Sequence, residues 1–118
     1  MSYTLTEAEE RLAKLIWEKE PLPSSALVTL CEEAFDWKKS TTYTMLKRLE
    51  QKGVFQNKGS VVQALLSQEE WESQESRKMV ADGFGGSLPR FLTAFTRGNR
   101  LTKEEVNRLR CWLDDQEG

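Results

Sequence analysis

Of the side chains that commonly take part in catalysis, this chain of 118 residues has many carboxylates but no histidine. Histidine is absent, which removes Ser-His and Cys-His nucleophile pairs, His-ligated zinc sites and the side chain that titrates nearest to neutral pH. The 19 carboxylates alternate with basic residues on helix-like segments, as the charges of solvated helix faces do. We therefore expect a protein that is not an enzyme and that holds no metal and no cofactor.

Two further features of the composition bear on where the protein works. Its two cysteines, Cys31 and Cys111, are too few for a disulfide scaffold. The sequence has no apolar run near the roughly 18 residues of a membrane span, and its N-terminus lacks the basic and apolar regions of a secretory signal. These features predict a reduced, cytoplasmic protein that does not enter a membrane.

Positive charge is gathered in one segment of the chain. Residues 7–36 carry eight acidic and three basic side chains, whereas residues 37–58 carry six basic side chains and a single carboxylate, Glu50. A local excess of this kind is typical of a surface that faces phosphate groups, even though the net charge of the whole chain is −2. The chemistry indicated is binding to nucleic acid.

The basic segment contains a predicted helix, at residues 38–52, whose two faces differ. One face has the i, i+3, i+4, i+7 spacing of a helix side that points into a core: Thr42, Met45, Leu46 and Leu49. The other presents hydroxyls, an aromatic ring and cations but no carboxylate: Ser40, Tyr43, Thr44, Lys47 and Gln51, with Thr41 and Arg48 on its flank. A helix selected only for solubility usually mixes both charge signs, so we expect this face to meet phosphates and base edges.

The elements around this helix follow a known order. Two helices precede it: the first opens at a capping box formed by Thr6 and Glu9, and the second is capped by Ser24 or Ser25. A β-hairpin with a glycine in its turn follows. This order predicts a mainly α-helical fold with a small β-hairpin wing, a winged helix-turn-helix DNA-binding domain at residues 1–66, whose third helix enters the major groove.

Residues 67–118 contain three further predicted helices, and the last two have strongly apolar faces. The apolar side chains of these faces are Leu88, Phe91, Leu92, Phe95, Val106, Leu109, Trp112 and Leu113. A segment this small cannot bury them by itself, so we expect a second copy of the chain to cover them, which makes residues 67–118 a dimerisation domain. The alternative is that these faces dock back onto the N-terminal domain.

Over most of its length the chain resembles the penicillinase and methicillin-resistance repressors and the related copper-responsive repressors. The most specific similarity lies in the third helix, where Trp37 is followed by Thr41, Thr44-Met45-Leu46, Arg48-Leu49 and Lys52-Gly53. The opening helix and the dimerisation half are similar at Leu5-Thr6-Glu7-Ala8-Glu9 with Trp17, and at Gly85-Gly86-Ser87 with Leu101-Thr102. The resemblance implies a homodimeric winged-helix repressor that binds double-stranded DNA at an inverted-repeat operator.

The resemblance also implies which residues contact the operator. They are Lys39, Ser40, Thr41, Tyr43, Thr44, Lys47 and Arg48 of the third helix and Lys58 at the hairpin tip. The outer face of the helix suits base edges and nearby phosphates, whereas Thr41 and Arg48 suit phosphates or support within the helix. For Arg48, a salt bridge to an acidic residue of the first two helices is the alternative.

This sequence departs from the family pattern at three places in the DNA-binding half, one of which is Glu10, where the family usually has an aromatic residue. Lys38 and Lys39 stand where the family usually has a side-chain cap and often a proline, so the start of the third helix is less clearly marked. The hairpin lacks the arginine and tyrosines that are usual there. Weaker contacts from the wing are therefore expected.

The resemblance suggests two kinds of inducing signal. Antibiotic-responsive members are inactivated by proteolysis in the dimerisation half, and the matching bond joins Ala94 and Phe95, which makes a sensor protease a candidate partner. The family has Asn where this chain has Ala94, and Phe95 also suits a core position. Copper-responsive members hold metal with paired Cys-x-Cys motifs, and Cys111 alone lies near this C-terminus, so we do not expect copper sensing.

The function expected from these features is a homodimeric DNA-binding transcriptional repressor whose repression is relieved by an inducing signal. The alternative is a winged-helix adaptor that binds a partner protein through the apolar face at Leu88, Phe91, Leu92 and Phe95 and does not bind DNA. The net negative charge and the atypical wing favour this alternative slightly.

Overall fold

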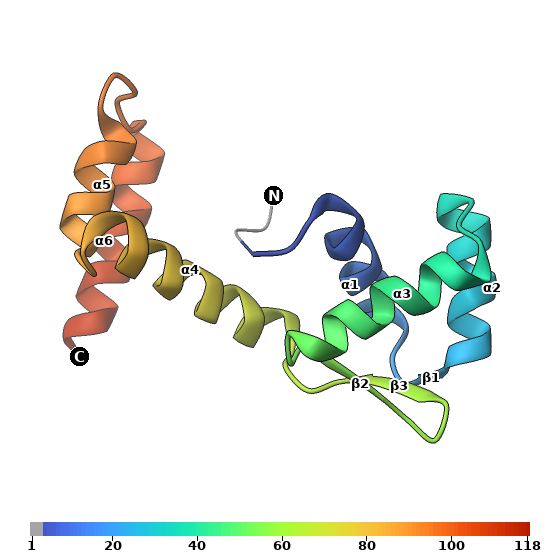
Figure 1. Ribbon diagram of the computed structural model, residues 1–118. Helices are drawn as coiled ribbons and strands as arrows, with labels where there is room; N and C mark the ends of the chain where they lie inside the picture. Colours follow the sequence, from blue (N-terminus) through green and yellow to red (C-terminus); the bar gives the residue numbers. More distant parts are fainter. Residues whose placement is uncertain (1–3) are drawn as a thin grey trace. The chain divides into compact units, whose positions relative to one another are not determined.

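The computed structural model describes residues 4–118 and contains, within that range, six helices and three short strands (Figure 1). In chain order they are α1 (Glu7–Lys19), β1 (Leu22–Pro23), α2 (Ser24–Phe35), α3 (Lys39–Gln51), β2 (Phe55–Lys58), β3 (Val61–Ala64), α4 (Gln68–Phe84), α5 (Leu88–Thr96) and α6 (Lys103–Glu117). The chain divides into two compact units, the first ending at Met79 and the second comprising Val80–Gly118. The expected fold class, mainly α-helical with a small antiparallel sheet after the third helix, is confirmed.

Helix α1 begins where the sequence predicts. The Thr6 hydroxyl accepts a hydrogen bond from the Glu9 N–H at 3.2 Å, and the Glu9 carboxylate accepts one from the Thr6 N–H at 3.0 Å, which confirms the capping box. The apolar side of the helix then buries Leu12, Ala13 and Ile16 completely. This side of α1 belongs to the core on which α3 packs.

Helix α2 begins directly from a strand. Its N-cap is Pro23 and no side chain caps it, so the expectation that Ser24 or Ser25 caps this helix is wrong. Pro23 still belongs to β1, and the Ser24 N–H is already bonded to the Ser60 carbonyl at 2.8 Å. The helix ends at Asp36, whose left-handed backbone (φ 57°) turns the chain towards α3.

The hairpin after α3 forms as expected and gains a third strand. Strands β2 and β3 pair antiparallel, with Lys58 opposite Val61. The two residues between them, Gly59 and Ser60, have φ values of 60° and 63°, as in a type I′ turn whose twist matches that of the strands. Strand β1 adds to the other edge of β3, so the sheet order is β1-β3-β2. Strand β1 is not predictable from the sequence, because a strand of two residues has no periodicity.

The core of the first unit is formed by α1, α2, α3 and the sheet, and it extends onto the beginning of α4. The Trp17 ring lies 5.1 Å from the Phe55 ring, and the Trp17 Nε1–H donates to the Leu66 carbonyl at 2.9 Å. Trp71 of α4 is buried in the same core. The first turns of α4 therefore belong to the first unit, while the functional boundary expected between residues 66 and 67 stays a prediction.

The second unit contains the end of α4 together with α5 and α6. Helix α4 continues to Phe84, so the glycine-rich break begins at Gly85 and Gly86, which both have positive φ, 59° and 77°. The Ser87 side chain caps α5, and a capping box opens α6. Neither α5 nor α6 contains a buried residue. None of the helices in residues 4–118 is both long and apolar enough to cross a membrane.

Candidate nucleic-acid interface

Helix α3 is held to the first unit by the stripe that the sequence predicts. Thr42, Leu46 and Leu49 are buried, and Met45 is half-buried against the same core. Lys38 is the N-cap and makes no side-chain capping bond, which agrees with the weakly marked start of this helix. The packing of one side fixes which residues α3 turns to solvent.

The opposite side of α3 is exposed and carries no free carboxylate. Lys39, Ser40, Thr44, Lys47 and Arg48 are exposed, and Thr41 is half-buried. The single carboxylate of this helix, Glu50, is half-buried and accepts a hydrogen bond from the Asn57 N–H at 3.3 Å. The remaining exposed side chains are cations and hydroxyls on a rigid helix, and they form a surface that can bind phosphate oxygens and base edges.

Tyr43 belongs to this surface only in part. Its ring packs against the core, and its hydroxyl donates to the Ser24 Oγ at 3.2 Å, which ties α3 to the start of α2. The ring also lines a surface pocket of about 480 Å³ together with Lys47, Glu50, Gln51 and Asn57. Tyr43 therefore links the two helices of the helix-turn-helix while one side of it stays accessible beside Lys47.

The tip of the hairpin provides one further cation. Lys58 is exposed at the end of β2, directly before the turn at Gly59 and Ser60. The remaining exposed side of the wing is uncharged, with Val61 and Leu65 as its exposed apolar residues. Lys58 is thus the wing residue that can reach a phosphate.

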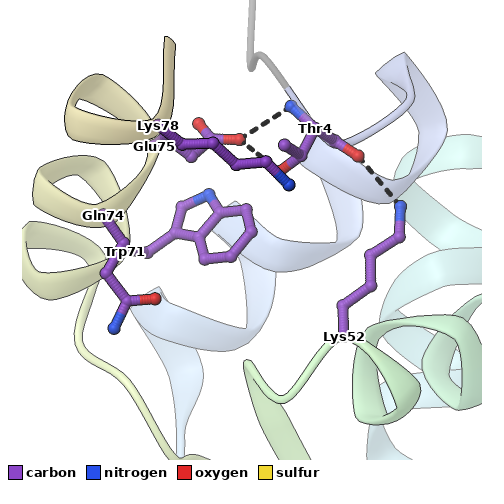
Figure 2. A pocket seen from close by; sticks show the side chains of 6 residues that line it. All are labelled: Thr4, Lys52, Trp71, Gln74, Glu75 and Lys78. Atoms are coloured by element: carbon purple, nitrogen blue, oxygen red, sulfur yellow. Dashed lines mark hydrogen bonds between the residues drawn. The ribbon is translucent and has the colours of Figure 1, made fainter. Parts of the chain in front are cut away.

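Lys52, the C-cap of α3, forms an ion pair within the first unit that the sequence does not predict. Its Nζ lies 2.8 Å from the Glu9 Oε2 and donates to the Glu9 Oε1 at 3.0 Å. It also donates to the Thr4 carbonyl at 3.0 Å (Figure 2). Burial alone would raise the pKa of Glu9, but the hydrogen bonds from Lys52 and Thr6 outweigh it and hold that pKa below its ordinary value of 4.5. The sequence shows Glu9 as a capping residue, but no local pattern joins it to a lysine 43 positions away.

The expected dimer-interface residues lie on α5 and α6 of the second unit. Leu88, Phe95, Trp112 and Leu113 are exposed, by 43%, 58%, 47% and 52%, and Phe91, Leu92, Val106 and Leu109 are half-buried. Phe91 contacts the Phe84 and Phe95 rings at centroid distances of 5.2 and 5.9 Å. Between α5 and α6 lies an apolar pocket of about 320 Å³. Within this unit, the apolar faces remain open to solvent.

The residues that bear on induction and redox chemistry differ in their exposure to solvent. Ala94 and Phe95 are both exposed on α5. Burial raises the pKa of the Cys31 thiol above its ordinary value of 9.0, against the opposing effect of a hydrogen bond with Thr42, so this thiol stays protonated and unreactive at neutral pH. Cys111 is exposed. Among residues 4–118, no three His, Cys, Asp or Glu side chains group as metal ligands do.

Comparison with known proteins gives one result that spans nearly the whole chain. The family model described as penicillinase repressor matches residues 5–115. A search of curated proteins found no match. The matched range contains every helix and strand described above except the last two residues of α6. The chain therefore belongs to the penicillinase repressor family, a family of DNA-binding transcriptional repressors and not of enzymes.

Proposed function

We propose that this protein is a cytoplasmic homodimer that represses transcription by binding an inverted-repeat operator, with α3 of each protomer in one of two successive major grooves. The observation that carries the proposal is the exposed side of α3, which offers cations and hydroxyls and whose single carboxylate, Glu50, is half-buried and hydrogen-bonded to the Asn57 N–H. A helix packed along one side and polar along the other has the shape and chemistry that major-groove reading requires. Phosphate neutralisation would supply most of the affinity, so binding falls steeply with salt.

Each residue of this surface has a role in the proposal. Ser40, Thr44 and Lys47 reach base edges and nearby phosphates, and Tyr43 adds the accessible side of its ring beside Lys47. Lys39, Thr41 and Arg48 bind phosphates on the flank of α3. Lys58 binds the flanking backbone from the wing, where it is the one exposed cation of β2, β3 and the turn between them.

A second copy of the chain would cover the apolar faces of α5 and α6. Eight apolar side chains lie there without a buried member among them, and an apolar surface of this kind on a small unit is typical of an interface. A two-fold axis between two copies makes the DNA site an inverted repeat, because each protomer reads the same half-site.

Repression would end when the dimer is lost. The bond between Ala94 and Phe95 is the position at which a sensor protease would act, and both residues are exposed in the single chain. Cutting α5 there separates Phe95 from Phe91 and Leu92, which removes the continuous apolar face. Monomers contact one half-site instead of two and bind the operator far more weakly.

The test is selection of DNA from a pool of randomised duplexes by the full-length protein. The wild type is expected to enrich an inverted repeat, and Lys47→Ala is expected to bind the enriched duplex with about 1–3 kcal/mol less affinity, or roughly 5- to 150-fold. Lys14→Ala, which removes an exposed lysine from α1 of the same unit, is the matched control and should bind like the wild type.

Two results would count against the proposal. If the wild type enriches no sequence, the protein does not read DNA, and the adaptor that binds a partner protein through α5 becomes the better interpretation. If Lys47→Ala and Tyr43→Ala combined bind the enriched duplex as tightly as the wild type, the exposed side of α3 is not the reading surface.

A further inference from the structure

Thr4, which precedes α1, is hydrogen-bonded to helix α4 within the first unit. The Thr4 backbone N–H and the Thr4 hydroxyl both donate to the Glu75 Oε1, at 2.9 and 2.7 Å (Figure 2). The Thr4 carbonyl accepts a hydrogen bond from the Lys52 Nζ at 3.0 Å. Thr4 thus uses all three of its polar groups, two on α4 and one on the end of α3, and we call these three bonds the Thr4 clip.

The Thr4 clip lies beside an apolar anchor on the same face of α4. Trp71 and Glu75 are four residues apart, so they lie on one side of the helix. The indole ring is buried in the core of the first unit, and Figure 2 shows it directed into the pocket of about 340 Å³ that Thr4, Lys52 and Glu75 also line. The anchor holds the first turn of α4 by packing, and the clip holds the next turn by hydrogen bonds.

Through Lys52 the clip reaches the elements that present the DNA-binding surface. Lys52 is the C-cap of α3, and its ammonium is paired with the buried Glu9 of α1 at 2.8 Å. Thr4 therefore joins α4 to the C-terminal end of α3 through hydrogen bonds with Glu75 on one side and with Lys52 on the other. Helix α4 continues without a break beyond Met79 to Phe84, into the second unit.

We propose that Thr4 and Glu75 are positioning residues that determine which separation of operator half-sites the repressor accepts. The proposal rests on the proposed function, because it concerns how two copies of α3 are spaced on one duplex. Trp71 attaches the first turn of α4 to the first unit, and the clip adds an attachment one turn further along the helix. The more firmly this part of α4 is held, the narrower is the range of spacings that two copies accept.

The geometry of DNA makes spacing a sensitive measure of this restraint. Inserting two base pairs between the half-sites turns one of them by roughly 70° about the duplex and moves it by about 7 Å. A rigid dimer cannot follow that change, so the affinity gained from the second half-site is lost. Loss of stability or of folded protein, by contrast, lowers binding to every spacing by the same factor.

The experiment repeats the selection from randomised duplexes with four full-length variants and then measures binding to the enriched site with two base pairs inserted. Glu75→Ala removes both hydrogen bonds between Thr4 and α4, whereas Thr4→Val removes only the bond from the hydroxyl. Glu75→Gln keeps a carbonyl oxygen that can accept both bonds. Glu72→Ala removes an exposed carboxylate from the same helix one turn away and is the matched control.

The wild type, Glu72→Ala and Glu75→Gln are expected to enrich one spacing and to bind the lengthened site about tenfold or more weakly. Glu75→Ala is expected to enrich the same half-site sequence at several spacings and to reduce that penalty to about threefold or less. Thr4→Val, which keeps the backbone N–H donor, should fall between them.

The outcomes separate the two proposals. A wild type that enriches no repeat contradicts the proposed function and this inference with it. A wild type that enriches a single spacing, together with Glu75→Ala and Thr4→Val proteins that enrich the same single spacing, overturns the inference alone. If Glu75→Ala does not fold, the comparison of Thr4→Val with Glu75→Gln tests the inference. Thr4→Val must then tolerate the two inserted base pairs better than Glu75→Gln does, and equal tolerance overturns the inference.

Discussion

The two units of this protein are built from the same local signals but differ in what their helices bury. Capping boxes open α1 in the first unit and α6 in the second, and amphipathic stripes run along the helices of both. In the first unit the stripes meet in a closed core, whereas α5 and α6 contain no buried residue. Local signals therefore suffice to form helices, but the completion of a core depends on how many apolar faces one chain can bring together.

Two phenylalanines show what this difference means energetically. The side chain of Phe55 is 1% exposed in the first unit, and that of Phe95 is 58% exposed in the second. Complete burial of such a side chain contributes about 1.5–3 kcal/mol. The single chain already gains that free energy at Phe55, while most of it remains available at Phe95 for association. The first unit therefore has a closed core within the single chain, whereas the second leaves much of its apolar surface exposed.

The largest predicted effect on the stability of either unit is that of Phe55→Ala. The substitution removes a fully buried ring that also contacts Trp17, so it should lower the free energy of unfolding of the first unit by about 3–5 kcal/mol. Urea denaturation followed by tryptophan fluorescence measures the change, which should not depend on protein concentration. Leu65→Ala, at a residue 52% exposed in the same unit, is the control and should cost little. Equal losses for the two variants would show that the first unit has no specific core at this place.

The next effect is expected in the second unit, and it should appear in association. Phe95→Asp places a charge on the apolar face that a second copy would cover, and desolvating it should raise the dimer dissociation constant about 100-fold, or by about 3 kcal/mol. Sedimentation equilibrium measures that constant. Leu65→Asp introduces the same charge at an equally exposed apolar residue of the first unit and should leave the constant unchanged. Matching shifts for both variants would contradict the assignment of association to the second unit.

The sequence predicts those features of both units that follow from residues close in the chain. The capping box at Thr6, the buried stripe of α3 and the glycine-containing turn of the hairpin formed as expected, because each depends on spacing within a few residues. The exposure of Lys39, Ser40, Thr44, Lys47 and Arg48 on the side of α3 opposite the core follows from the same periodicity. Their contact with DNA stays a prediction.

The features that the sequence does not predict are contacts between segments that lie far apart in the chain. The Glu9–Lys52 pair, the Thr4–Glu75 bonds and the pairing of β1 with β3 connect residues about 40 to 70 positions apart, and nothing in the local composition selects one partner over another. Lys52 illustrates the consequence: as a cation in a basic segment it counts towards phosphate binding, yet its ammonium is paired inside the protein. Charge along the sequence therefore overstates the charge that a surface presents.

The smallest predicted effect is a difference in stability between substitutions at two glutamates, one in each unit, that occupy the same position in a capping box. Glu9 and Glu105 both stand at the third position of a capping-box helix, and hydrogen bonds hold the pKa of each below 4.5. Glu9 is also buried and paired with Lys52, whereas Glu105 is exposed. Glutamine can serve in a capping box, so Glu105→Gln should change the free energy of unfolding hardly at all. Glu9→Gln loses the ion pair, and because the Lys52 side chain is 36% exposed, screening limits the loss to about 1 kcal/mol at pH 7.

The pH dependence of that loss identifies its cause. Since the pKa of Glu9 is lower in the folded protein than its ordinary value of 4.5, the folded state binds this proton more weakly, and the carboxylate stabilises the fold fully above about pH 5. Its contribution falls as the pH drops through the folded pKa, so the difference between the wild type and Glu9→Gln in urea denaturation should shrink from pH 6 towards pH 3.5. A difference that stays constant over that range would mean that shape and packing, and not the charge on Glu9, join α1 to the end of α3.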